Sequence, residues 1–271
     1  MNIHFTDSKL FEALKNATLV KIKVGSNLYG LNDEESDIDY LYIYATSKAE
    51  LNSFVQTNHQ LQYKEAGVDH NFVSMHQFIR NSLNGDSTIN YEVIQSDALI
   101  GTCLEFLTVN KFMFNTYTIM KSYLGLMNRD IRHYGKSNTE RKQEKQLMHI
   151  IRGYMFAYNI LQYGENEMFT FEETCETLQM IKQRLNMDIC NKIVKDYGQK
   201  MADCRLIMND RLDRKVLGLP KYMTVADIGY IDSKLYHLMQ TAEFQDKQYA
   251  IQNFDMQYFW NSAENWVSYE N

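Results

Sequence analysis

The spacing of apolar residues changes near residue 105, and this change constrains the fold more than any other feature of the sequence. Before it, short segments such as residues 17–24 (ATLVKIKV) alternate between apolar side chains and lysines, which is typical of strands. Beyond it, apolar residues recur every three or four positions, as they do over residues 139–163, which is typical of helices. The sequence therefore predicts an α+β fold, with a small mixed sheet followed by a helical bundle.

Turn and capping residues predict where the elements end. Residues 60–73 are expected to form a hairpin that is broken at Gly67. Ser74 followed by Gln77 is a capping box, so the chain is expected to turn from strand to helix near Met75. The other expected elements are strands at 17–24 and 37–45 and helices at 4–16, 139–163, 170–185, 188–216 and 224–243. The single proline favours long uninterrupted helices. Two domains are expected, at residues 1–104 and 105–271, and because no linker rich in Gly, Ser or Pro separates them they are expected to pack tightly.

Charge and composition exclude several classes of protein. Twenty-eight Lys and Arg against 34 Asp and Glu give a net charge of −6, which argues against broad DNA binding and requires a local basic patch for any contact with nucleic acid. No apolar run approaches the ~18 residues of a membrane span, and the N-terminus does not resemble a signal peptide. The four cysteines are far apart, which predicts reduced thiols, no structural zinc site and a cytoplasmic protein.

Residues 24–44 (VGSNLYGLNDEESDIDYLYIY) contain the residues best suited to chemistry. They carry three short motifs in order: Gly25-Ser26, Tyr29-Gly30 and Ser36-Asp37-Ile38-Asp39. Asp37 and Asp39 are two positions apart at a strand, so they are expected on one face, about 6.6 Å apart along the chain. Two carboxylates so close favour a bound cation, and a Gly-Ser turn offers N–H groups and a hydroxyl to a phosphate. Tyr40, Tyr42 and Tyr44 alternate along the same strand and are expected to pack on the sheet rather than to stack on bases.

These motifs resemble the signature of the DNA polymerase β type nucleotidyltransferase superfamily. Within it, the chain is most similar to bacterial and bacteriophage nucleotidyltransferases labelled as an RNA-repair-associated polymerase β family. The similarity extends to residues 68–80 (VDHNFVSMHQFIR) and 90–97 (NYEVIQSD), and more loosely to 142–154. It implies that residues 1–104 are a nucleotidyltransferase core, in the cytoplasm of a bacterium or a phage-infected host.

The resemblance also implies the chemistry. Two Mg²⁺ ions, with Mn²⁺ as an alternative, would be held by three carboxylates, including Asp37 and Asp39. The metals would orient an NTP and activate an acceptor hydroxyl for attack on the α-phosphorus. Gly25, Ser26, Tyr29, Gly30 and Ser36 would bind the nucleotide.

The third carboxylate has two candidates. Asp69 lies between Val68 and Phe72 on a strand that leads into the Ser74 helix, as the family pattern requires. Glu65 lies beside the predicted turn at Gly67, where a solvated carboxylate is common. Asp69 is the preferred catalytic and metal-binding residue, and Glu65 is the alternative.

A basic stripe on the helix at 139–163 is the last candidate. Lys142, Lys145, His149 and Arg152 follow one another at steps of three or four, so they lie along one side of the helix. Such a stripe is often only solvated, but a cation within an apolar stretch needs an anion. We therefore predict that Lys145, His149 and Arg152 contact nucleotide phosphate or RNA, in the same cleft as the metal site.

The acceptor stays open at this stage. RNA, such as a tRNA 3′ end, is the first candidate because of the resemblance, although the net charge of −6 weakens it. A protein hydroxyl, as in antitoxins that transfer AMP to a toxin, is second, and a small molecule such as an aminoglycoside is third. The alternative from another class is a non-catalytic nucleotide-binding protein that keeps the fold.

Overall fold

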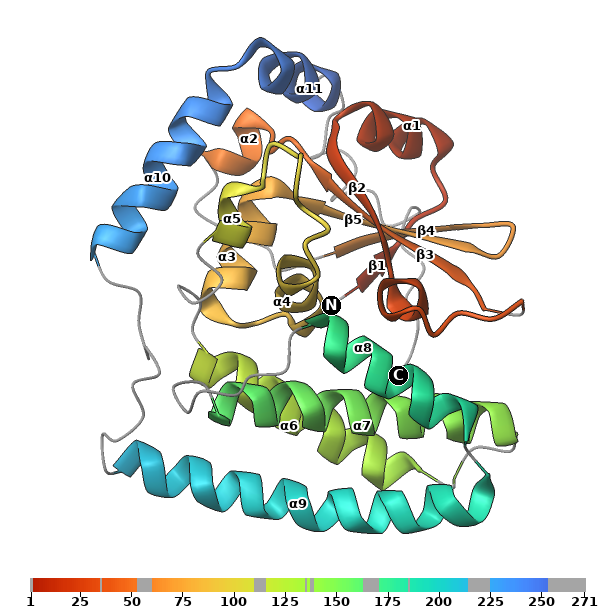
Figure 1. Ribbon diagram of the computed structural model, residues 1–271. Coiled ribbons are helices and arrows are strands. Elements are labelled where there is room, and N and C mark those ends of the chain that lie inside the picture. The colour runs from red at the N-terminus through yellow and green to blue at the C-terminus, as the bar shows by residue number, and fades with distance from the viewer. Residues whose placement is uncertain are drawn as a thin grey trace.

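The computed structural model describes residues 2–34, 36–52, 60–109, 116–134, 136, 139–162, 171–184, 186–213 and 225–252. Figure 1 shows a sheet with helices around it and a group of long helices beneath. The fold is α+β, as predicted.

Five strands form one mixed sheet in the order β1-β4-β5-β3-β2. They are β1 (Asn2–His4), β2 (Thr18–Val24), β3 (Ile38–Tyr44), β4 (Gln60–Glu65) and β5 (Val68–Ser74). β3 and β5 run parallel, as do β1 and β4, whereas β2 pairs with β3 and β4 pairs with β5 in antiparallel fashion. The strands predicted at 17–24 and 37–45 and the hairpin broken at Gly67 are confirmed.

The helix predicted over 4–16 is shorter than expected. Residues Asn2–His4 form the edge strand β1, and the helix α1 covers only Ser8–Asn16. Asp7 caps this helix, because its carboxylate accepts hydrogen bonds from the backbone N–H groups of Lys9 and Leu10. Pairing of the first residues with β4 therefore replaces the first turn of the predicted helix.

Alternation along β3 divides the buried side chains into two clusters. Leu41 and Ile43 belong to the larger cluster, on one face of the sheet, and Tyr42 and Tyr44 to the smaller one, on the other face. The predicted packing role of the tyrosines is confirmed for Tyr42, whose ring stacks on Phe72 at 4.6 Å, and for the buried Tyr44.

Short helices follow β5 and cover the face with the larger cluster. Ser74 caps α3 (Met75–Asn84) through a hydrogen bond from the Gln77 N–H, as the capping box predicts. α4 (Thr88–Gln95) comes next and buries Glu92 along with Tyr91, Val93 and Ile94. Two single-turn helices, α2 (Lys48–Leu51) and α5 (Phe106–Val109), complete this part of the chain.

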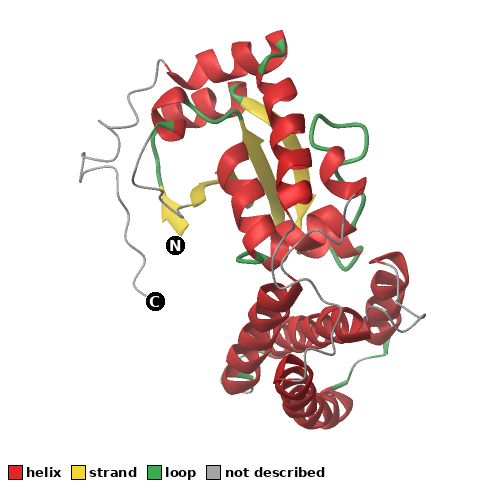
Figure 2. Cartoon of the chain, turned by 90° about the vertical axis from the view of Figure 1, so that its left-hand side faces the viewer, coloured by secondary structure: helices red, strands yellow, loops and turns green. Residues whose placement is uncertain are grey.

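Long helices dominate after residue 105, as predicted. α6 (Thr116–His133), α7 (Glu140–Gln162), α8 (Phe171–Gln183) and α9 (Met187–Asp213) gather beneath the sheet, and Figure 2 shows them as a separate cluster of helices. The helix predicted at 224–243 is divided into α10 (Val225–Met239) and α11 (Ala242–Gln252). The second begins where Thr241 accepts a hydrogen bond from the Phe244 N–H. Thr170 and Thr224, at the predicted starts of two helices, lie outside the described residues.

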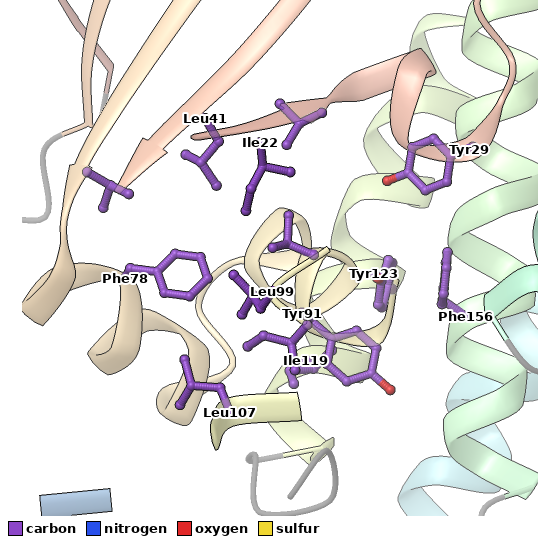
Figure 3. Close-up of a cluster of buried hydrophobic side chains, with 14 of the residues drawn as sticks. Ile22, Tyr29, Leu41, Phe78, Tyr91, Leu99, Leu107, Ile119, Tyr123 and Phe156 are labelled. Atoms are coloured by element: carbon purple, nitrogen blue, oxygen red, sulfur yellow. The ribbon is translucent and has the colours of Figure 1, made fainter. Parts of the chain in front are cut away.

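The larger hydrophobic cluster continues from the sheet into the long helices. It includes Ile22 and Leu41 on strands and Tyr123 and Phe156 on α6 and α7, and Figure 3 shows these side chains together. The division into domains at residues 104 and 105 stays a prediction.

Two further sequence predictions concern cysteines and membranes. Cys103, Cys175 and Cys190 are free thiols, as predicted, and burial raises the pKa of Cys175 to about 11. Among the described residues, no helix has both the length and the apolar character that a membrane span requires.

Candidate active site

The turn after β2 brings the backbone against a carboxylate of β3. Gly25 opens a 3-10 helix, η1 (Gly25–Tyr29), with a φ of +66°. Val24, just before it, is the register partner of Asp39. A Cβ atom placed on Gly25 would lie only 2.5 Å from Asp39 Oδ2. Glycine therefore serves two needs here, the positive φ and the close approach.

Asp39 and Asp69 lie side by side on adjacent strands. They are register partners in the parallel pair of β3 and β5. The pKa of Asp39 is raised by burial, then by the neighbouring charges of Asp69 and Asp37, against the opposite effects of Lys145 and Lys64. The exposed Asp37 lies just before β3. The structure thus brings all three predicted carboxylates into electrostatic contact at one end of β3.

The alternative carboxylate, Glu65, is placed differently. It is the last residue of β4, opposite Val68 at the hairpin, and is exposed. Asp69, in contrast, accepts a hydrogen bond from Gln62 Nε2 at 3.0 Å and forms an ion pair with Lys64 Nζ at 2.9 Å. Of the two candidates, Asp69 is the one next to Asp39.

These carboxylates suit a divalent cation in their chemistry. Mg²⁺ prefers oxygen ligands and one or two carboxylates. A cation would also relieve the repulsion from Asp69 and Asp37 that adds to the effect of burial on the pKa of Asp39. Within the part of the chain that the structure describes, however, no group of three or more His, Cys, Asp and Glu side chains is arranged to hold a metal ion. The donor atoms fit the metal, while Asp69 is engaged with Lys64.

Ser36 shapes the loop before the carboxylates. Its hydroxyl donates to Asp33 Oδ1 at 2.7 Å and accepts from the Asp33 N–H at 2.9 Å. Hydrogen bonding by Ser36 and Lys182, with the charges of Lys182 and Arg141, lowers the pKa of Asp33. Arg141 Nη2 and Lys182 Nζ lie 3.1 and 3.3 Å from its two carboxylate oxygens. The loop that precedes Asp37 is therefore fastened to both α7 and α8.

The tyrosine-glycine motif is fastened to α8 as well. Gln179 Nε2 donates to the backbone carbonyl of Tyr29 at 3.0 Å. Gly30 follows with a φ of +65°, and a Cβ atom there would collide with the Gln179 side chain. Gln179 and Lys182 were absent from the predicted site, because no spacing in the sequence relates α8 to residues 29–33.

The basic stripe on α7 runs from the carboxylates into the interior. Lys145 is exposed and its charge acts on Asp39. At the far end, Arg152 is 18% exposed, with Nε 3.5 Å from Glu92 Oε1 and the guanidinium carbon 4.6 Å from the centre of the Tyr29 ring. Burial works against the charge of Arg152, but Glu92, Tyr29 and Tyr123 outweigh it and raise the pKa.

His149 lies between these two cations and is neutral at pH 7. Burial and the charges of Arg152, Lys145 and Arg129 lower its pKa to about 3. Asp130 Oδ2 lies 3.8 Å from His149 Nδ1, which would favour a charged ring, but Arg129 already pairs with this carboxylate at 3.0 Å. Burial and the neighbouring cations therefore keep the His149 ring neutral.

Glu92 is a buried charged residue that was not among the predicted site residues. It is fully buried and accepts hydrogen bonds from the Tyr29 hydroxyl and, at 2.9 Å, from the Tyr123 hydroxyl. A sequence signal existed, because Glu92 is the acidic residue in an otherwise apolar turn of helix, YEVI, within the segment that carried the resemblance.

Comparison with known proteins gives one family. The model of RlaP, described as the RNA repair pathway DNA polymerase beta family, matches residues 7–214. Neither the curated proteins nor the solved structures give a match. The matched residues include the whole sheet from β2 onward, the three carboxylates and the helices through α9. The chain therefore belongs to the RNA repair pathway DNA polymerase beta family.

Proposed function

We propose that this protein is a metal-dependent nucleotidyltransferase that moves a nucleoside monophosphate from an NTP to an acceptor hydroxyl. The observation that carries the proposal is the placement of Asp39 between the Gly25 turn and Asp69. A glycine turn that opens a 3-10 helix suits a phosphate, and paired carboxylates beside it suit the metals that accompany a triphosphate. Membership of a polymerase beta family supports the same chemistry.

Asp37, Asp39 and Asp69 would hold the metal, as two Mg²⁺ ions or two Mn²⁺ ions. When bound, the metal neutralises phosphate charge and lowers the pKa of an attacking hydroxyl. Lys64 would leave Asp69 for solvent or for a phosphate, because the metal takes over the compensation of the carboxylate charge.

The chain's own residues would position the nucleotide. Gly25 and Ser26 offer N–H groups and a hydroxyl, and Tyr29, Gly30 and Ser36 keep the loop in place around them. Lys145, which is exposed and acts on Asp39, is suited to contact a phosphate oxygen. His149 and Arg152 lie further along the same stripe, and their contact with phosphate remains a prediction. Catalysis of this kind rests on orientation and charge neutralisation, with no covalent intermediate on the protein.

RNA, such as a tRNA 3′ end, is the preferred acceptor. The family description, which names an RNA repair pathway, supports this choice. With a net charge of −6, the protein can bind RNA only through a local basic patch. A protein hydroxyl therefore remains the second candidate acceptor.

The test is transfer of label from each α-labelled NTP to total RNA, to lysate proteins or to small molecules. With Mg²⁺ present, the wild-type protein should label RNA. Asp39→Asn and Asp69→Asn should lower the rate at least about 1,000-fold, because they remove charge that the metals and triphosphate require. Asp37→Asn should act in the same way.

Two control variants also replace a carboxylate by an amide, as the site variants do. Asp246→Asn, at an exposed position of α11, changes the net charge equally and should leave transfer intact. Glu65→Gln should be nearly silent, and a loss of transfer there with full transfer in Asp69→Asn would move the third carboxylate to Glu65. Full transfer in both Asp37→Asn and Asp39→Asn would refute the mechanism, and label on a protein band alone would replace RNA by a protein acceptor.

A further inference from the structure

A buried polar cluster joins the Gly25 turn to three helices. Its members are Tyr29 on η1, Glu92 on α4, Tyr123 on α6 and Arg152 on α7. Tyr29, Glu92 and Tyr123 are at most 3% exposed. Tyr29 and Tyr123 lie at one end of the larger hydrophobic cluster, near Phe156 (Figure 3). The four residues come from segments far apart in the sequence, so only the tertiary fold brings them together.

The contacts in this cluster converge on Glu92. Both carboxylate oxygens accept a tyrosine hydroxyl, one from Tyr29 and one from Tyr123. The guanidinium of Arg152 supplies the opposite charge, with Nε 3.5 Å from Glu92 Oε1. This Nε is buried and, among the described residues, makes no hydrogen bond. A carboxyl group without exposure to solvent requires such partners.

Arg152 also covers the ring of Tyr29. Its guanidinium carbon lies 4.6 Å from the ring centre, within range for a cation–π contact. Tyr29 is thus held at its hydroxyl by Glu92 and on its ring face by Arg152. Because Tyr29 is the last residue of η1, holding its side chain also fixes the turn that starts at Gly25 and touches Asp39.

We propose that Glu92 and Arg152 are positioning residues that act through Tyr29 to set the Gly25 turn against Asp39. On this assignment, which rests on the proposed function, Arg152 serves catalysis without touching the phosphates. The alternative is the direct phosphate contact predicted from the basic stripe. The two differ in which partners matter, since only positioning requires Glu92 and the Tyr29 hydroxyl.

The first measurement is amide hydrogen exchange, which needs no activity. Arg152→Gln, Glu92→Gln and Tyr29→Phe should each raise exchange in residues 24–31 at least about 10-fold, because the turn opens locally more often. Exchange in residues 187–200 of α9 should stay within about 2-fold, which separates local opening from global destabilisation. Lys200→Gln is the matched control, because Lys200 also pairs with a carboxylate, Asp196 at 2.9 Å, and lies over a tyrosine ring, Tyr197 at 5.1 Å. It should leave residues 24–31 unchanged.

The second measurement separates kcat from KM. Under positioning, all three variants lower kcat about 10-fold or more while the KM for NTP changes less than about 2-fold. Arg152→Lys should restore part of kcat, since it keeps the charge beside Glu92 but loses the planar group over Tyr29. The double variant Glu92→Gln with Arg152→Gln should lose no more than the worse single variant, because the pair acts as a unit.

Other results would overturn the inference. A raised KM in Arg152→Gln alone, with Glu92→Gln and Tyr29→Phe silent, would make Arg152 a direct phosphate ligand. Unchanged exchange in residues 24–31 in all folded variants would also reject positioning, and Tyr29→Phe supplies this test even where a charge variant fails to fold. If the wild-type protein transfers no label but exchange rises as stated, the proposed function fails and the structural coupling to the turn stands.

Discussion

At Asp39, burial and two neighbouring carboxylates all act against the ionised form. Burial is the largest effect on its pKa, and the charges of Asp69 and Asp37 add to it. The charges of Lys145 and Lys64 compensate only in part. Asp39 therefore contributes to the site at some expense of stability, as charged groups in functional sites often do.

Asp39→Asn should leave the melting temperature without metal unchanged or raise it. The substitution removes like-charge repulsion, so the free energy of unfolding does not fall even though transfer is lost. Thermal unfolding at pH 7 with EDTA measures this, with Asp246→Asn as the control for net charge. A clear drop in the melting temperature would mean that Asp39 holds the fold together.

His149 should make the stability of the wild-type protein fall at mildly acid pH. Its pKa in the folded protein is about 3, whereas an unfolded chain has a value near 6.5. Stability from the neutral ring is therefore complete above about pH 6.5 and is lost as the pH falls toward 3, because the unfolded chain binds the proton first. The side chain is 38% exposed, which weakens the effect without changing its sign.

The measurement compares His149→Gln with the wild-type protein at pH 7.5 and pH 5. The variant, which takes up no proton, should gain in melting temperature relative to the wild-type protein as the pH is lowered. A difference that stays constant with pH would show that the pKa of His149 is the same in the folded and unfolded protein. A variant that instead loses melting temperature relative to the wild-type protein would show a charged ring paired with Asp130.

Among the elements, the short helix η1 and the loop after it are held from several directions. Gly25 touches Asp39 on β3, and Gln179 on α8 binds the Tyr29 carbonyl. Just beyond it, Lys182 binds the Leu31 carbonyl and Arg141 binds Asp33. A single turn of 3-10 helix has little stability alone. Its position is therefore set by α7, α8 and β3 together.

Gly25→Ala should be far more harmful than Gly67→Ala. Both glycines have a positive φ, of +66° and +79°, but nothing lies within 4 Å of a Cβ on Gly67. Gly67→Ala should cost about 1–2 kcal/mol of unfolding free energy through the backbone alone and should keep transfer. Gly25→Ala should cost more and lower kcat at least about 10-fold, because the new methyl group displaces the Asp39 carboxylate.

Denaturant unfolding and transfer assays of the two variants measure these effects. If the two variants lost the same unfolding free energy and Gly25→Ala kept full transfer, the turn would have room for a methyl group beside Asp39.

For the molecule as a whole, one buried cluster links the sheet to the helices beneath it. It contains residues of β2 and β3, of α6 and α7, and of α11 near the end of the described chain. α11 lies back beside α1 and α2 (Figure 1), and Gln248 Nε2 donates to the Thr46 carbonyl at 2.7 Å. Because α11 packs on the first part of the chain, we expect unfolding to be a single transition in which the two predicted domains melt together.

Phe244→Ala tests this contribution of α11. Phe244 is 1% exposed within the larger cluster, whereas Tyr249 on the same helix is 65% exposed. The first substitution should cost about 3–5 kcal/mol of unfolding free energy, and Tyr249→Ala less than about 0.5 kcal/mol. Chemical denaturation with a probe in each half measures both. Two separate transitions, or a loss below about 1 kcal/mol for Phe244→Ala, would show that α11 folds independently of the sheet.

Local patterns in the chain were enough to predict most of the strands and helices and the chemistry of the first motif. Alternation over residues 17–24 and 37–45, the Gly67 turn and the Ser74 cap depend on a few neighbouring residues, so they could be predicted from the chain alone. The choice of Gly25 and Ser26 beside Asp37 and Asp39 followed from the same local order and from the family resemblance.

Which distant residues meet became evident only from the folded chain. Asp69 lies beside Asp39 because β5 inserts between β4 and β3, and strand order is not encoded in the period of any one strand. The short edge strand β1 forms because β4 is there to pair with it. Glu92 and Arg152 lie 60 positions apart and Lys182 binds a loop about 150 residues earlier. Such pairs form because burial of the shared core outweighs the entropy of closing long loops, and that balance depends on the whole chain.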